Sequence, residues 1–178
     1  CIDWRAGKYV EATGSDAATD CIDCVAGTYV EGAGSFLESN CTMCQAGTHS
    51  AVVSSSSAAD CIECLAGKYV AVAGSSQATD CIDCNAGQYV DTAGSDEASD
   101  CVDCEENTYS SVAGSAVCLD CPVGKYVDVT GSDEASDCID CNDFALSPSV
   151  QDNSCLSCVG GEAENCTNAT CASGYHSY

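Results

Sequence analysis

Apolar residues occur in this chain as isolated pairs separated by polar turns, and not as long runs or helical stripes. From Cys81 to Asp100 the sequence reads CIDC, then AGQYV, then GS, then a short acidic run with Ala and Ser. Each half of this phrase is too short and too rich in turn residues for a helix. It predicts a short strand through Tyr89 and Val90, a turn at Gly94 and Ser95, and a return segment into the next cysteine pair.

The same phrase recurs along most of the chain, which predicts an array of small units. The first cysteines of successive CxxC pairs from Cys21 to Cys101 are 20 residues apart, and two later steps shorten to 17 residues. A fixed period of this length indicates one unit stacked on copies of itself, each contacting mainly its neighbours. The CxxC pairs begin at Cys21, Cys41, Cys61, Cys81, Cys101, Cys118, Cys138 and Cys155. We expect tandem repeats over residues 1–141, and degenerate repeats over residues 142–178 that continue beyond the chain end.

The first shortened step indicates which part of the unit is dispensable. GSAVC, from Gly114 to Cys118, replaces GSDEASDC, so the missing residues come from the acidic return segment. We therefore predict that this segment is a surface loop that tolerates trimming.

Two further positions recur within the units. A glycine follows the second cysteine by three residues, and Asn107 replaces it once, which predicts a left-handed backbone because Asn tolerates positive φ best after Gly. Two residues later stands a tyrosine, replaced once by His49. We expect these aromatic residues to pack over a disulfide or the next unit and to supply most of the apolar contact. The positions are Gly27, Gly47, Gly67, Gly87 and Gly124, and Tyr29, Tyr69, Tyr89, Tyr109 and Tyr126.

The composition does not support a large hydrophobic core. The chain has 2 Phe, 1 Trp and 1 Met, and much of its 46% hydrophobic fraction is Ala and Cys, which bury little apolar area. Nineteen of the 178 residues are cysteine, a density typical of disulfide scaffolds in oxidising compartments. The predicted fold class is a series of small disulfide-rich repeats that form an elongated, solenoid-like rod of short two-stranded β units and turns, with little helix.

Our pairing hypothesis joins the second cysteine of each pair to the first cysteine of the next pair, so that every unit is one closed loop. The first unit supports this register, because Trp4 replaces the second cysteine of the initial pair and Cys1 can serve as the partner of Cys21. Cys171 is left over, either unpaired or for an intermolecular bond. The pairs are Cys1 with Cys21, Cys24 with Cys41, Cys44 with Cys61, Cys64 with Cys81, Cys84 with Cys101, Cys104 with Cys118, Cys121 with Cys138, Cys141 with Cys155, and Cys158 with Cys166.

Metal binding is the alternative interpretation of the cysteines and of the acidic residues. Two successive CxxC pairs also satisfy the spacing of a four-cysteine zinc site. Each such site would add two negative charges to a chain whose net charge is already −24, with only 4 Lys and Arg residues, so we favour disulfides. Calcium would suit acidic groups such as Asp96, Glu97, Asp100 and Asp103, but they lack an ordered ligand spacing. A solvated acidic face is the favoured interpretation, with no cofactor.

Other functional classes are disfavoured by charge and by missing chemistry. The negative charge argues against nucleic acid and anionic membranes as partners. No apolar stretch approaches the ~20 residues that span a bilayer, so no direct membrane insertion is expected. No catalytic constellation is present, and His49 and His176 both occupy tyrosine positions, where they act as packing substitutes. We expect a protein that is not an enzyme.

Three sequons offer sites for N-glycosylation. They begin at Asn40, Asn165 and Asn168, and the first two have cysteine in the middle position. In a secreted chain such asparagines are plausible acceptors, and we expect at least one to be occupied.

The segment CIDCNAGQYVDTAGSDEASDCVDC, from Cys81 to Cys104, resembles the ephrin-receptor-like cysteine-rich repeats of the growth-factor-receptor cysteine-rich superfamily. The resemblance covers Cys1 to Cys141, and the proline usual after the second cysteine survives only as Pro122. It implies elongated, disulfide-laddered extracellular rods with little regular secondary structure.

We predict a structural protein of the extracellular space or cell surface. It would be a glycosylated, disulfide-stapled segment of a fibre, surface hair or matrix filament, and its partners would be copies of itself or other extracellular proteins. The alternative is the ectodomain stalk or ligand-binding region of a cell-surface receptor or adhesin. Such a region would carry varied repeats with Trp, Tyr or Arg anchors, and here Trp4 and Arg5 are the only such irregularities.

Overall fold

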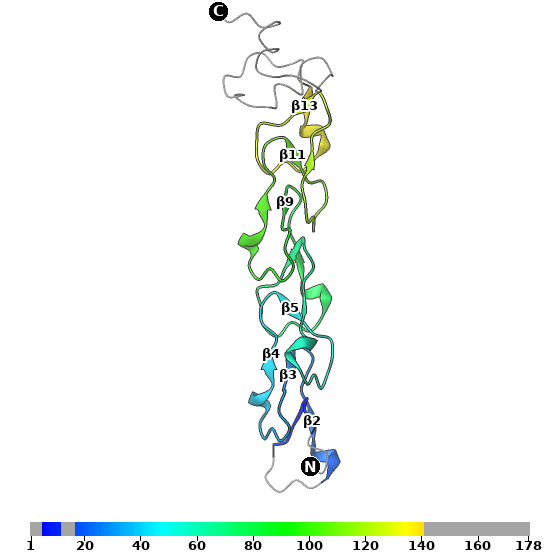
Figure 1. Cartoon of the computed structure of the whole chain (residues 1–178), viewed down its shortest axis with the longest axis vertical. Helices are drawn as coiled ribbons and strands as arrows, with labels where there is room; N and C mark the ends of the chain where they lie inside the picture. Colours follow the sequence, from blue (N-terminus) through cyan, green and yellow to red (C-terminus); the bar gives the residue numbers. More distant parts are fainter. Residues whose placement is uncertain (1–4, 12–16, 141–178) are drawn as a thin grey trace, which may run out of the picture.

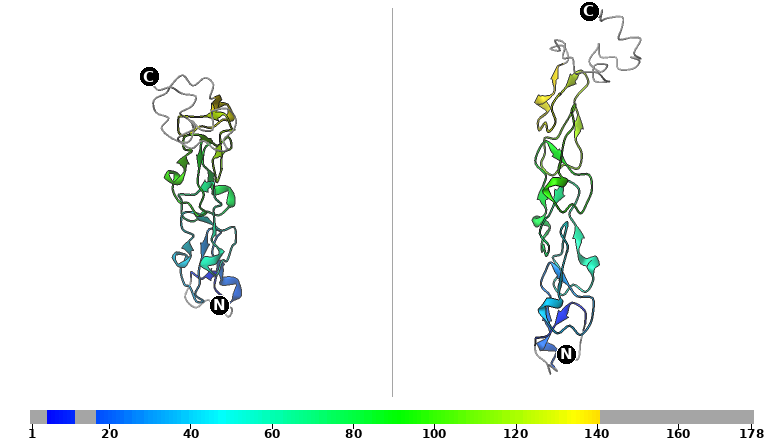
Figure 2. Two further views of the ribbon diagram at one scale, coloured as in Figure 1. Left: turned by 45° about the horizontal axis from the view of Figure 1, so that its top comes forward. Right: turned by 90° about the vertical axis from the view of Figure 1, so that its left-hand side faces the viewer.

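The chain forms a narrow rod in which the units follow one another along the long axis. The computed structural model describes residues 5–11 and 17–140. The colours run in sequence order from one end of the rod to the other (Figure 1), and two further views show the same slender outline (Figure 2). The predicted elongated rod is therefore confirmed. The boundary predicted at residue 141 and the degenerate repeats after it lie at or beyond the edge of the described residues.

Each unit contains one antiparallel pair of two-residue strands. The described residues hold seven such sheets and no α-helix, as the sequence predicts. The pairs are β1 (Lys8–Tyr9) with β2 (Ile22–Asp23), β3 (Thr28–Tyr29) with β4 (Thr42–Met43), β5 (Thr48–His49) with β6 (Ile62–Glu63), β7 (Lys68–Tyr69) with β8 (Ile82–Asp83), β9 (Gln88–Tyr89) with β10 (Val102–Asp103), β11 (Thr108–Tyr109) with β12 (Leu119–Asp120), and β13 (Lys125–Tyr126) with β14 (Ile139–Asp140).

The register places the tyrosine opposite the apolar residue that lies between two cysteines. In the unit that begins at Cys84, Tyr89 is the partner of Val102 and Gln88 is the partner of Asp103. The strand expected through Tyr89 and Val90 therefore ends one residue earlier, at Tyr89. Cross-strand pairs of an aromatic and a β-branched residue are among the more stabilising combinations in antiparallel sheets.

The acidic return segment folds into a single 3-10 turn, where the sequence predicts only a surface loop. The turns are η1 (Ala18–Asp20), η2 (Glu38–Asn40), η3 (Ala58–Asp60), η4 (Ala78–Asp80), η5 (Ala98–Asp100) and η6 (Ala135–Asp137). In η5 the Oδ2 atom of Asp100 accepts hydrogen bonds from the backbone N–H groups of Asp96 at 3.0 Å and Glu97 at 3.1 Å. The shortened unit has no such turn between β11 and β12. Its strands and its disulfide are nevertheless retained, as expected for a segment that tolerates trimming.

The most completely buried side chains of the described residues are cysteines, valines and serines that recur along the rod. The second cysteine of the units is at most 2% exposed at Cys24, Cys44, Cys64, Cys84 and Cys104. The residue after the tyrosine is buried in each unit, as Val10, Val30, Val70, Val90 or Val127, or as Ser50 or Ser110. Among the described aromatic positions only Tyr9 is buried. The other described tyrosines and His49 are half-buried, so they also contribute to the contacts of their units.

Backbone hydrogen bonds join each unit to the next. Between the third and fourth complete units, the Gly67 N–H donates to the Val90 carbonyl at 2.7 Å, and the Val70 N–H donates to the Ser95 carbonyl at 3.1 Å. In a third bond, the N–H of the turn glycine Gly94 donates to the carbonyl of Cys64, the second cysteine of the pair that begins the earlier unit. The first of these bonds recurs at every junction from Gly7 to Asn107, at 2.7 to 3.0 Å. The units therefore add to one another by main-chain pairing.

The glycines after the cysteines bring next-but-one units together. Gly67 has a φ of +87° and Asn107 a φ of +66°, so the left-handed backbone expected from the sequence is present. A Cβ atom at Gly67 would collide with the carbonyl oxygen of Gly114, two units further along. Equivalent close approaches occur at Gly7, Gly27, Gly47 and Gly87. Contacts are thus not confined to adjacent units, in contrast to the nearest-neighbour expectation.

Candidate functional site

Disulfides close each described unit into a loop and form a ladder along the rod. They join Cys24 to Cys41, Cys44 to Cys61, Cys64 to Cys81, Cys84 to Cys101, Cys104 to Cys118 and Cys121 to Cys138, with Cα atoms 5.6 to 5.8 Å apart. Such separations are within the normal range for disulfides. These six pairs coincide with those of the pairing hypothesis. Cys21 is also disulfide-bonded.

The remaining cysteine assignments fall on residues outside the described part of the chain. They are Cys1, Cys141, Cys155, Cys158, Cys166 and Cys171.

The cysteines of the described region are not available as thiolate ligands for zinc. A zinc site requires deprotonated thiols, and each cysteine from Cys21 to Cys138 is in a disulfide. Over residues 5–11 and 17–140, no three His, Cys, Asp or Glu side chains are grouped so that they could hold a metal ion.

The acidic residues that the sequence places together serve different purposes in the structure. Asp100 accepts backbone hydrogen bonds within η5, and Asp103 accepts a bond from the Gln88 side chain at 2.9 Å across the sheet. The described acidic residues of this group therefore do not converge on one point. They form a solvated negative surface on the rod, and their carboxylates organise the local backbone.

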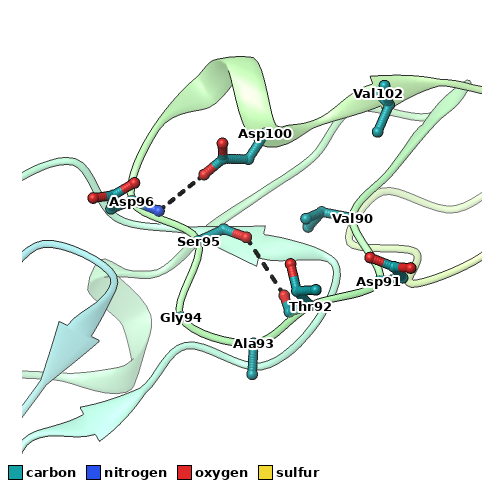
Figure 3. Close-up of a pocket in the computed structure, with 9 residues that line it drawn as sticks. All are labelled: Val90, Asp91, Thr92, Ala93, Gly94, Ser95, Asp96, Asp100 and Val102. Carbon is teal, nitrogen blue, oxygen red and sulfur yellow. Dashed lines mark hydrogen bonds between the residues drawn. The ribbon is translucent and has the colours of Figure 1, made fainter.

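A shallow hollow of about 300 Å³ lies beside the turn of the unit that begins at Cys84. It is lined by Val90, Asp91, Thr92, Ala93, Gly94, Ser95, Asp96, Asp100 and Val102. The Ser95 hydroxyl donates to the Thr92 carbonyl at 3.4 Å, and the Asp96 N–H donates to Asp100 (Figure 3). The lining contains neither histidine nor lysine. These polar groups hold the unit's own turn, and the hollow offers no nucleophile paired with a base.

His49 takes the place of a tyrosine in β5, opposite Ile62. Its Nδ1 atom is buried and has no hydrogen-bond partner among the described residues. No second titratable side chain is bonded to it there, so its surroundings are those of a packing residue, as the sequence predicts. His176, like Asn165 and Asn168, lies outside the described residues.

Lysine and aspartate form cross-strand ion pairs at the same position of three units. The pairs are Lys8 with Asp23, Lys68 with Asp83, and Lys125 with Asp140. Asp23 accepts hydrogen bonds from Lys8 and from the Ser54 hydroxyl, and these bonds, with the charge of Lys8, lower the pKa of Asp23 below its ordinary value. A carboxyl with a lowered folded pKa stabilises the fold above its unfolded pKa, and that contribution is lost as the pH falls through the folded pKa.

We expect the variant Lys8→Met to raise the pKa of Asp23 towards its ordinary value, because the main cause of the shift is the Lys8 hydrogen bond. The variant would then lose less folding stability than the wild type as the pH falls from the ordinary carboxyl pKa to the lowered pKa of Asp23. Titration of the Asp23 side-chain carboxyl by NMR measures this directly. Lys68→Met is the matched control, since it breaks an equivalent pair with Asp83 and leaves Asp23 unaffected. An unchanged Asp23 pKa in the Lys8 variant would contradict this account.

No helix within the described residues is long and apolar enough to cross a membrane.

The fold and the disulfide ladder together define an elongated, cysteine-rich repeat module whose stability rests on cross-links and main-chain pairing. The model of the family described as tyrosine-protein kinase ephrin type A/B receptor-like matches residues 52–101 and 92–138. Residues 52–138 therefore carry ephrin-receptor-like cysteine-rich repeats, and the resemblance found in the sequence is confirmed over this part of the chain. Repeats of this kind indicate an extracellular, disulfide-rich module and are typically not enzymatic. No curated protein sequence matches the chain significantly.

Proposed function

We propose that this chain is a structural segment of an extracellular fibre, surface hair or matrix filament, with no enzymatic activity. The observation that carries the proposal is the uniform junction, in which the same backbone hydrogen bond recurs from Gly7 to Asn107. A module built to bind one ligand needs a few distinctive anchors at one place. Here the invariant part of each unit makes contact with other units, and this favours a load-bearing or spacing role.

The surface of the rod also supports a structural role. Its exposed large apolar residues are distributed along the whole described length, from Ile22 to Ile139, and are aliphatic apart from Phe36 and Met43. The net charge of −24 keeps such a surface soluble and makes lateral association dependent on salt.

The alternative function is a ligand-binding region of a receptor or adhesin ectodomain, and one unit favours it. The unit from Cys24 to Cys41 and the strand after it expose Phe36, Leu37 and Met43 to 55%, 58% and 60%. Other units carry polar or small residues at these positions, apart from Val117 in the shortened unit. If the protein binds a partner through its repeats, this irregular unit is the place to test.

Sedimentation velocity of the secreted, oxidised chain tests the fibre proposal. Raising the ionic strength from about 0.01 M to about 0.15 M shortens the Debye length from about 30 Å to about 8 Å and so screens repulsion between rods. We expect the weight-average sedimentation coefficient to rise with salt and with protein concentration, and electron microscopy to show filaments or bundles. An unchanged monomeric coefficient under all these conditions would contradict self-assembly. Binding of an extracellular partner that Phe36→Ser abolishes would support the alternative.

A further inference from the structure

The last residue is an aspartate in every described 3-10 turn except one. Its carboxylate accepts backbone N–H bonds at the start of the turn, for example from Ser76 and Gln77 to Asp80 at 2.8 and 2.9 Å. The same arrangement is made by Asp20, Asp60, Asp100 and Asp137. Closing the turn is therefore the structural reason for an acidic side chain at this position.

Asn40 stands at this position in η2 and does not perform that role. None of its side-chain atoms bonds to a backbone N–H of the described residues, and the N-cap residue Leu37 makes no side-chain cap either. Asn40 is exposed to solvent. The Asn40 side chain therefore does not close its turn, unlike the aspartates at the same position of the other turns.

The backbone around Asn40 presents an acceptor sequon on the surface. Cys41, with φ −72° and ψ 105°, is extended, so the side chains before and after it lie on the face opposite its own. Cys41 packs against the buried cluster of Tyr9, Cys24 and Val30. Asn40 and Thr42 are both exposed. The amide and the hydroxyl that define the sequon therefore share the solvent-facing side of this segment, while the disulfide occupies the other side.

We propose that Asn40 is the N-glycan acceptor of the repeat array. The proposal rests on the extracellular location in the proposed function, because the donor is a polyprenyl-diphosphate-linked oligosaccharide of the secretory route. The Nδ2 atom of Asn40 forms a bond to the anomeric carbon of the first sugar, and the bond from that carbon to the diphosphate oxygen breaks. The amide nitrogen loses one proton, the lipid diphosphate leaves, and no group is oxidised or reduced.

The position explains how the rod tolerates a glycan. A glycosylated asparagine in place of any of the turn aspartates would lack the carboxylate that holds the turn, whereas at Asn40 no hydrogen bond of the described structure is lost. The glycan would also stand beside the exposed Phe36 and Leu37 and shield this apolar part of the surface. The unit from Cys24 to Cys41 is therefore the glycosylated unit. Its departure from the repeat pattern at Asn40 provides the acceptor for that modification.

The test is site-resolved glycopeptide mapping of the full chain secreted from eukaryotic cells. In the Asn165→Gln, Asn168→Gln background the only sequon left is at Asn40. We expect a glycan on this peptide that peptide-N-glycosidase removes, with conversion of Asn40 to aspartate. Both Asn40→Gln and Thr42→Ala should abolish it completely.

Asn40→Asp is the matched structural control, because it restores the residue that the other turns carry and removes the sequon. This variant should fold, form the same disulfides and lack the glycan. If the chain is secreted with its disulfides formed and Asn40 is unmodified, the glycan proposal fails and the proposed function stands. If the secreted chain instead shows free thiols, or is not exported, both fail.

Discussion

Removing the disulfide between Cys84 and Cys101 by the paired change Cys84→Ser and Cys101→Ser is expected to destabilise its unit by about 3 kcal/mol. The bridge closes a loop with a sequence separation of 17, and a loop of about 15 residues contributes roughly 3 kcal/mol through the entropy of the unfolded chain. Cys84 is 2% exposed, so a hydroxyl there adds a further cost of about 1 to 3 kcal/mol if it finds no partner.

Hydrogen exchange is the appropriate measurement, because an array does not unfold as one cooperative unit. We expect lost protection in residues 84–101 and in the junctions on both sides, where Cys84 N–H donates to the Gly67 carbonyl and Gly114 N–H donates to the Cys84 carbonyl. Distant units should keep their protection. Val72→Ser, at a position 69% exposed, is a control that should change little. Unaltered protection in the double variant would show that the main-chain ladder suffices without the bridge.

Gly67→Ala is expected to be among the most damaging single substitutions in the array, at about 3 kcal/mol or more. An alanine pays about 1 to 2 kcal/mol for the left-handed backbone at φ +87°. Its Cβ atom would also collide with the backbone carbonyl of Gly114, which cannot rotate away as a side chain can. Relief requires the backbone of two units to move apart, and overpacking of this kind typically costs a further 1 to 3 kcal/mol or so.

Two other glycines separate the contributions. Gly124 has a similar φ of +84°, but no atom of the described residues lies within 4 Å of its Cβ position, so from the described contacts Gly124→Ala should cost only the backbone term of about 1 to 2 kcal/mol. Gly32 has no positive φ and no neighbour within 4 Å in the described part of the chain, and Gly32→Ala should be within about 0.5 kcal/mol of neutral. The order is measured by hydrogen exchange at the junctions. Equal effects at Gly67 and Gly124 would show that the close approach does not matter.

The sequence revealed the features of this rod that are local to one unit. The period, the turn at Gly94, the left-handed position marked by Asn107 and the strand through Tyr89 all depend on residues within a few positions of one another. The 3-10 turns were missed because a single turn gives no periodic signal, although the Asp that follows Ser, Gln or Glu by three residues marks a capping arrangement.

Contacts between units were less visible in the sequence. Gly67 and Gly114 are 47 positions apart, and nothing local indicates that a backbone from the next-but-one unit lies against the glycine. The deeper burial of the valine than of the tyrosine before it was also not evident, because a two-residue strand shows no alternation from which to infer it. At Asn40 the signal was present, because the repeat places aspartate there in other units, but its meaning required knowledge of what the aspartate does.

The cross-links also govern how the molecule behaves under tension. A pulling force would follow the shortest covalent route, which crosses each bridge between cysteines whose Cα atoms lie 5.6 to 5.8 Å apart and then the short spacer between the cysteines of a pair. Three peptide steps of that spacer give at most about 11 Å. The residues inside each loop are shielded from the load, so an oxidised tether would be nearly inextensible, and reduction would convert it into a long, compliant one.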